Sequence, residues 1–197
     1  MQSKKLKRGF TLLELLVVIA IIAILSVVVV FFIDPVEILK KSRDVQRISD
    51  LTTLKTATAI YLQDNASNSL GATVACGTTG TVYTDAASTV IRASVSSTWN
   101  YVDEFSATTT NAGLAANFIP VNYQGVSSGA PISNLPLDPV NNTTYYYRYG
   151  CWANNAFEFD TNFESTAYTV TDDRRSKDGG NNATRYEVGT DLRVMGL

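Results

Sequence analysis

One long apolar run near the start of the chain constrains its fold more than any other feature. Residues 10–33 form a stretch of 24 residues in which Glu14 is the single ionisable side chain. An α-helix of this length extends about 36 Å, whereas the hydrocarbon core of a bilayer is about 30 Å thick. The run is therefore predicted to be a membrane-spanning helix that carries one carboxylate.

The length and the end of this run distinguish a retained anchor from a cleaved secretory signal. A secretory signal has an apolar stretch of about 7–15 residues, followed by a cleavage site built from small residues. Here the stretch is longer, and its last part, from Val27 to Ile33, consists of bulky residues that offer no such site. We therefore expect the segment to remain in the mature chain.

Basic residues on both sides of the run bear on its orientation. Two clusters of four flank it, namely Lys4, Lys5, Lys7 and Arg8 before it and Lys40, Lys41, Arg43 and Arg47 after it. By number alone the positive-inside rule gives no preference. The first cluster lies directly beside the run, whereas Asp34 and Glu37 separate the second from it. This difference favours a cytoplasmic leader and an extracytoplasmic remainder.

Composition narrows the classes of function. The chain has no histidine, so it lacks the most common general base and the usual zinc ligand, and an enzyme is not expected. The net charge is −2, and because the leader carries four positive charges, the rest of the chain is acidic. Specific nucleic-acid binding is therefore not expected either.

The carboxylate of Glu14 has two interpretations. It lies only four residues into the run, so its side chain can extend to the lipid headgroups. Alternatively, it pairs with a cation from another chain, because a buried charge needs a partner and the side chains of this run supply none.

Residues 7–25, which read Lys-Arg-Gly-Phe-Thr-Leu-Leu-Glu and continue with apolar residues, resemble the start of a type IV prepilin or a type II secretion pseudopilin. The resemblance implies that a prepilin peptidase cuts between Gly9 and Phe10 and methylates the new amine of Phe10. It also implies that Glu14 pairs with the Phe10 ammonium of a neighbouring subunit during assembly.

The resemblance also implies a pilin-like α+β fold, in which a long N-terminal helix packs on a small antiparallel sheet. The expected organisation is a cleaved leader (1–9), a transmembrane and filament-core helix (10–33), its amphipathic continuation (34–64) and an extracytoplasmic head (65–197). Expected partners are membrane lipid, the prepilin peptidase, a membrane assembly platform with its motor ATPase, and further copies of the chain.

The second helical segment begins at a proline and has an amphipathic pattern. Pro35 predicts a kink or break beside Asp34. A stripe with three- and four-residue spacing is predicted to pack on the head, and it comprises Val45, Ile48, Leu51, Leu54, Thr58 and Tyr61. Three charge pairs, Glu37 with Lys41, Lys40 with Asp44 and Arg47 with Asp50, are expected on a solvated face, with contacts between subunits as the alternative.

The head contains one clear strand signal. In residues 144–149, Tyr145, Tyr147 and Tyr149 alternate with Tyr146 and Arg148. In residues 156–160, Phe157 and Phe159 alternate with Glu158 and Asp160, as in a half-buried antiparallel hairpin. Their aromatic face is predicted to lie on the long helix. The segment from Leu135 to Pro139 and the tyrosines after it resemble the approach to the sheet in pseudopilins.

Two further features concern metals and redox state. Asp172, Asp173 and Asp178 are weak calcium candidates in an oxygen-rich loop, but three nearby basic residues favour a plain solvated turn, and no other cofactor is expected. Cys76 and Cys151 are predicted to form a disulfide if the head is exported, with two buried thiols as the alternative.

These features predict a structural subunit of a type IV pilus-like filament, which would start in the inner membrane and finish outside the cell. Alternatives are a pseudopilin of a type II secretion system and a membrane-anchored extracytoplasmic binding protein that never polymerises.

Overall fold

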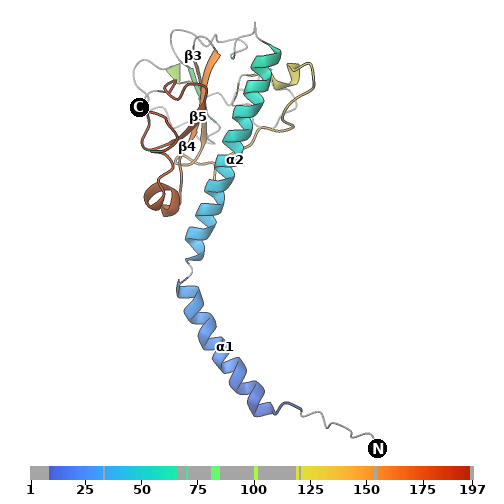
Figure 1. Ribbon diagram of the computed structural model, residues 1–197, viewed down its shortest axis with the longest axis vertical. Coiled ribbons are helices and arrows are strands. Elements are labelled where there is room, and N and C mark those ends of the chain that lie inside the picture. Colours follow the sequence, from blue (N-terminus) through green and yellow to red (C-terminus); the bar gives the residue numbers. More distant parts are fainter. Residues whose placement is uncertain are drawn as a thin grey trace, which may run out of the picture. The chain divides into compact units, whose positions relative to one another are not determined.

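The computed structural model describes residues 9–32, 34–65, 70, 81–84, 100–101, 119, 121–152 and 155–195. The chain divides into two compact units, residues 1–39 and 40–197. Its secondary structure consists of an apolar N-terminal helix, a second helix and a small sheet (Figure 1). The predicted α+β class is confirmed.

The two long helices, α1 (Leu12–Phe32) and α2 (Pro35–Asp64), are separate elements. Asp34 caps α2, because its Oδ1 accepts the backbone N–H groups of Val36 and Glu37 at 3.0 and 3.2 Å. Pro35 occupies the first helical position, where a missing N–H leaves no hydrogen bond unmade. The proline therefore starts a new helix at the predicted break.

In the described part of the chain, the sheet contains five strands in the order β2-β1-β3-β4-β5. Their bounds are β1 Thr81–Thr84, β2 Asn100–Tyr101, β3 Tyr147–Trp152, β4 Ala156–Thr161 and β5 Tyr186–Gly189. Strands β1, β3, β4 and β5 pair antiparallel, whereas β1 and β2 pair parallel over two residues. The short helix η1 (Tyr123–Gly125) and the π-helix η3 (Ala167–Thr171) lie in the connections.

The predicted hairpin is confirmed as β3 and β4, although β3 begins three residues later than expected. Asn142 holds the residues just before β3 in a turn, because its Oδ1 accepts the N–H groups of Thr144 and Tyr145 at 2.8 and 2.9 Å. At its other end, β3 extends past the predicted last residue, 149, through Gly150 to Trp152. Met195 lies so close there that a Cβ at position 150 would be 2.6 Å from its Cγ, so the strand needs glycine at this point.

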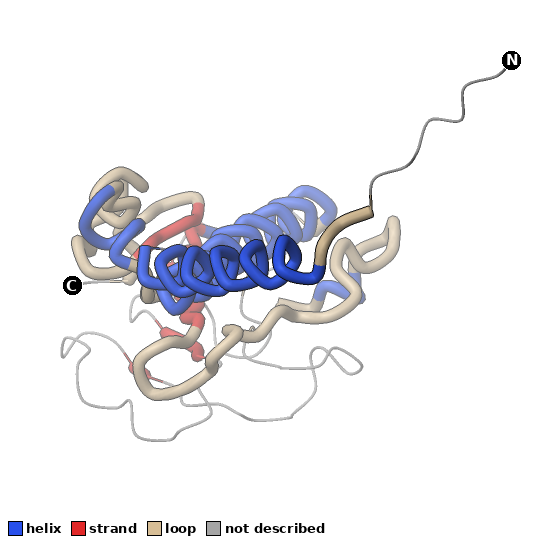
Figure 2. Tube along the Cα trace, turned by 90° about the horizontal axis from the view of Figure 1, so that it is seen from below, coloured by secondary structure: helices blue, strands red, loops and turns tan. Residues whose placement is uncertain are grey.

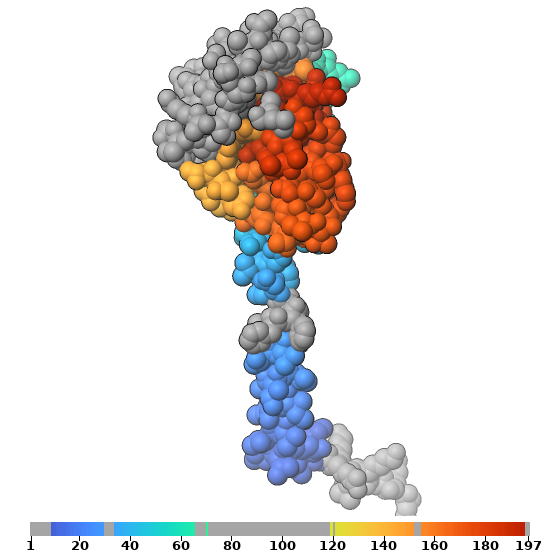
Figure 3. Space-filling model, turned by 90° about the vertical axis from the view of Figure 1, so that its left-hand side faces the viewer, coloured from blue at the N-terminus to red at the C-terminus, as the bar shows by residue number. Residues whose placement is uncertain are grey.

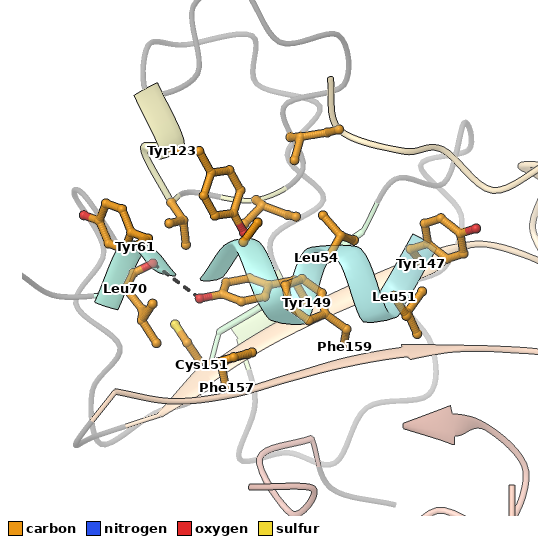
Figure 4. Close-up of a cluster of buried hydrophobic side chains, with 14 of the residues drawn as sticks. Leu51, Leu54, Tyr61, Leu70, Tyr123, Tyr147, Tyr149, Cys151, Phe157 and Phe159 are labelled. Atoms are coloured by element: carbon orange, nitrogen blue, oxygen red, sulfur yellow. Dashed lines mark hydrogen bonds between the residues drawn. The ribbon is translucent and has the colours of Figure 1, made fainter. Parts of the chain in front are cut away.

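The core lies between α2 and one face of the sheet (Figures 1, 2 and 4). The aromatic residues of the hairpin pack in one cluster with Leu51, Leu54 and Tyr61 of α2. These aromatic residues are Tyr147, Tyr149, Phe157 and Phe159. The predicted aromatic face against the helix is confirmed.

The expectation of a half-buried hairpin is wrong for its other face. The polar residues Arg148, Glu158 and Asp160, which alternate with the aromatic ones, are buried as well. Met195 covers this face, and its backbone N–H binds Glu158. Alternation indicated which side chains share a face, but not that a later segment would cover the polar one.

The predicted stripe on α2 holds from Leu51 onward but not before it. Val45 is 49% exposed, so this position is corrected, and Ile48 is only half-buried. The buried positions that precede Leu51 are Asp44 and Arg47, both fully buried. The face of α2 that packs on the head is therefore apolar in its later part and ionic in its earlier part.

Candidate functional site

The start of α1 is capped by a side chain of the N-terminal motif. Thr11 directly precedes the helix, and its Oγ1 accepts the backbone N–H of Glu14 at 3.2 Å. Together with Glu14 at the third helical position, this is the Thr-x-x-Glu pattern of a capping box. Glu14 therefore lies in the first turn of α1, where a negative charge interacts favourably with the helix dipole.

The peptide bond between Gly9 and Phe10, which precedes this cap, is accessible. Gly9 and Phe10 precede the helix, and no atom lies within 4 Å of the position that a Cβ on Gly9 would take. Phe10 is 85% exposed. The bond between them therefore lies in non-helical backbone that another protein can approach. Residues 1–8 of the predicted leader lie outside the described residues.

The surface of α1 is apolar on all sides. Its side chains from Leu12 to Val29 are exposed, and this stretch is long and apolar enough to cross a bilayer. Among the described residues, it is the only helical stretch that meets this criterion. Within the described part of the chain, no basic side chain forms an ion pair with Glu14.

A buried ion cluster joins α2 to two distant segments of the head. Arg47 pairs with Asp44 at 2.8 Å, with Asp138 at 2.6 Å and with Glu164 at 2.6 Å. Arg43, on the preceding turn, also binds Glu164. The cluster therefore connects α2 to the segments before β3 and after β4.

Backbone groups and one aromatic ring complete the cluster. Asp44 accepts the N–H groups of Glu164 and Ser165, and the ring of Tyr145 lies 5.0 Å from the guanidinium carbon of Arg47. Burial alone would lower the pKa of Arg47, but hydrogen bonds and charge from its three carboxylate partners raise this pKa above its usual value. Arg47 is therefore held in its charged form.

One of the charge pairs predicted on a solvated face of α2, that of Arg47 with Asp50, needs correction. Arg47 is buried and pairs with Asp44, Asp138 and Glu164 rather than with Asp50. Asp50 instead accepts a hydrogen bond from the hydroxyl of Tyr147 at 2.8 Å. Continuing the spacing of Leu51 and Leu54 backward along the helix reaches positions 47 and 44, and this was the sequence signal for the cluster. A stripe that is restricted to apolar residues does not include these two positions.

The carboxylates of the oxygen-rich loop are bound by groups of the same loop or of β5. Asp172 pairs with Arg174 and Lys177, and Asp173 pairs with Arg175. Asp178 accepts the backbone N–H groups of Gly180 and Glu187 at 2.9 and 2.8 Å. Among the described residues, no group of three or more potential ligands could hold a metal ion. The preference for a plain turn over a weak calcium site in this loop stays a prediction.

The predicted disulfide involves one described residue. Cys151 is fully buried in the core cluster, near the end of β3 (Figure 4). Cys76 lies outside the described residues, so its pairing with Cys151 stays a prediction.

Comparison with known proteins points to the N-terminal segment. No curated protein and no solved structure gave a significant match to the chain. Residues 4–30 match the family model described as the prokaryotic N-terminal methylation motif. The matched range contains the open Gly9–Phe10 bond, the Thr11 cap and Glu14. Residues 4–30 of the chain therefore carry the N-terminal signature of type IV prepilins and pseudopilins.

Proposed function

We propose that this protein is a structural subunit of a type IV pilus-like filament. The observation that carries the proposal is the methylation motif at residues 4–30, which extends over most of a helix whose apolar side chains are exposed. Such a surface is stable only in apolar surroundings. The bilayer provides these before assembly, and packed copies of the same helix provide them in a filament.

Processing would create the group that this filament needs. A prepilin peptidase would cut between Gly9 and Phe10 and methylate the new amine of Phe10. The open, non-helical backbone at this bond supports the assignment, because a protease must bind its substrate in an accessible conformation. The leader would stay on the cytoplasmic side and the head would lie outside.

Glu14 would then pair with the Phe10 ammonium of a neighbouring subunit. A carboxylate in an apolar medium requires a partner, and no basic side chain among the described residues supplies one. The partner would exist only after cleavage, so filament growth would accept processed subunits alone. A membrane assembly platform and its motor ATPase would supply the work of adding them.

A pseudopilin of a type II secretion system is the second candidate within this class. Asp172 and Asp173 are paired with basic residues of their own loop, and this favours a surface filament over a subunit that uses a calcium loop. A membrane-anchored binding protein that never polymerises would leave Glu14 without a role.

The test of assembly is Glu14→Ala in the native cell, with filaments sheared from the surface and quantified. We expect a cleaved, membrane-inserted protein that forms no filament. Glu37→Ala is the matched control, because Glu37 occupies the first turn of α2 as Glu14 does that of α1. Wild-type filament yield from Glu14→Ala would refute the pairing.

The test of processing is Gly9→Val, read by the mass of the N-terminal peptide. We expect the full-length precursor, because a Cβ and a branched side chain at this position obstruct the peptidase. Wild-type protein should yield a peptide that begins with methylated Phe10. Detection of that peptide in the variant would contradict the assigned cleavage rule.

A further inference from the structure

Four charged side chains lie on the buried polar face of the sheet, opposite the aromatic core. They are Arg148 of β3, Glu158 and Asp160 of β4, and Glu187 of β5. The segments after β4 lie together on one side of the head, where they are coloured orange to red in Figure 3. Among them, Val194 and Met195 are buried next to Gly150.

Both arginines of this region bind Asp160. Arg148 Nε lies 2.8 Å from Asp160 Oδ1, and Arg185 Nε lies 2.7 Å from the same oxygen. Burial alone would raise the pKa of Asp160, but these two cations bring it below its usual value. Asp160 is therefore ionised, and it forms ion pairs with both Arg148 and Arg185.

Glu158 and Glu187 each accept a backbone hydrogen bond through only one of their two carboxyl oxygens. Oε2 of Glu158 accepts the backbone N–H of Met195 at 2.8 Å, and Oε2 of Glu187 accepts that of Asn182 at 3.0 Å. The second oxygen of each, Oε1, is buried and receives no hydrogen bond from any N–H or O–H group of the described residues. Both side chains are almost completely inaccessible to solvent.

The strand register places these two carboxyl groups beside each other. Glu158 pairs across the ladder with Gly189, and Asp160 pairs with Glu187, so Glu158 and Glu187 are diagonal neighbours on one face. Their carboxyl groups are within hydrogen-bonding reach. Two ionised carboxylates are strongly unfavourable in such a site, because burial penalises each charge and the charges repel one another.

We propose that Glu158 and Glu187 bind one proton between them at neutral pH, and that this proton holds the C-terminal segment at Val194 and Met195 closed over the sheet. The protonated carboxyl donates its O–H to the other carboxylate, while the outer oxygens keep their bonds to Met195 and Asn182. The proton therefore acts as a structural ligand of the head.

The electrostatics of the neighbouring groups support this site. Burial raises the pKa of Glu158, and Glu187 and Asp160 raise it further, whereas the N–H of Met195 acts in the opposite direction. Burial also raises the pKa of Glu187, with added repulsion from Asp160 and Asp178. These are the groups that face the pair from β4, β5, the loop before β5 and the C-terminal segment.

This arrangement makes the stability of the head depend on pH in a defined direction. A carboxyl group with a raised pKa in the folded state contributes its full stability below its unfolded pKa, near 4.5, and loses it as the pH rises toward the folded pKa. The raised pKa values of Asp50 and Asp178, caused mainly by burial, act in the same direction. Because the chain has no histidine, no side chain with an ordinary pKa masks this effect between about pH 5 and pH 8.

The first test is the Tm of the full chain in detergent micelles, followed by the near-ultraviolet circular dichroism of its tyrosines, none of which lies in α1. We expect the wild-type Tm to fall by several degrees between about pH 5 and pH 8. In Glu158→Gln the amide replaces the O–H donor without an ionisable proton, and the fall should shrink to less than half. Glu187→Gln should behave alike, whereas the exposed control Asp191→Asn should keep the wild-type fall.

The second test needs no variant to establish the proton. At about pH 8, where an ordinary glutamate is ionised, the infrared spectrum of the wild-type protein should contain the carbonyl band of a protonated carboxyl group. Absence of this band, or a wild-type fall of Tm that persists in both glutamine variants, would overturn the proposal. It would also be overturned if millimolar calcium raised the wild-type Tm and Glu158→Gln abolished that effect, because the site would then hold a cation. None of these readouts depends on filament formation.

Discussion

Arg47 of α2 and Asp138 of the segment before β3 form a buried, bidentate ion pair. Arg47 Nε lies 2.6 Å from Oδ2 of Asp138, and Nη2 lies 2.9 Å from Oδ1. Neither side chain is accessible to solvent, although the residues are 91 positions apart. Because a planar guanidinium accepts only a narrow range of carboxylate positions, this pair fixes the register of α2 against the head.

Replacement of Arg47 should strongly destabilise the head. Arg47→Met leaves three carboxylates, those of Asp44, Asp138 and Glu164, without their shared cation. We expect a loss of about 3–5 kcal/mol, the usual cost of breaking a buried ion pair. Urea unfolding of the full chain in micelles, followed by tyrosine circular dichroism, measures this loss.

Arg43→Met is the matched control for that experiment. The side chain of Arg43 is 33% exposed, and its pair with Glu164 leaves Arg47 to neutralise the same carboxylate. The expected loss is about 1 kcal/mol or less, because Arg43 is partly exposed and Glu164 keeps Arg47 as a second cation. Equal losses for the two variants would contradict the central role assigned to Arg47.

Gly150 and Met195 should show coupled effects. Gly150→Ala places a Cβ 2.6 Å from Met195 Cγ, and overpacking of this kind costs about 1–3 kcal/mol. Met195→Ala removes the obstructing side chain, so the double variant should lose less stability than the sum of the single losses. A double-mutant cycle from urea unfolding measures the coupling, and additive losses would mean that the two residues do not meet.

The two cysteines should form one disulfide in the exported protein. Alkylation of the denatured, unreduced chain should modify neither Cys76 nor Cys151, and mass spectrometry should recover the two linked peptides. Cys76→Ser should lower the free energy of unfolding by about 2–4 kcal/mol, because the crosslink restricts the unfolded chain. Modification of both thiols in the denatured, unreduced chain would show that the alternative, two buried thiols, is correct.

Stability should also fall at strongly acid pH, through different carboxylates. Burial alone would raise the pKa values of Asp160 and Glu164, but their arginine partners lower them below the unfolded values of 3.8 and 4.5. Their contributions are present above those values and are lost as the pH falls through the folded pKa. The Tm measured from about pH 2 to pH 6 should therefore drop at its acid end, and Asp160→Asn should lower the Tm at about pH 6 and reduce that drop. A Tm in that variant equal to wild type would contradict the role of Asp160 as the shared partner of Arg148 and Arg185.

Features encoded by local pattern could be predicted from the sequence. The apolar α1, the start of α2 near Pro35 and the β3–β4 hairpin follow from hydrophobic runs, a proline and alternation, which depend on residues close in the chain. The shift of β3 by three residues was not predictable in this way. It depends on Asn142, which holds a turn before the strand, and on Met195, which packs on Gly150 from the far end of the chain.

The sequence by itself determined the N-terminal segment, because the cap at Thr11, the carboxylate of Glu14 and the apolar helix act within a few turns of one another. Only the tertiary structure decided which charges of the head are buried. The pairing of Arg47 with Asp138 and the approach of Glu158 to Glu187 join residues that are distant in the chain. A charge that reads as solvated in the sequence becomes a buried structural element when folding removes water from it and supplies a specific partner.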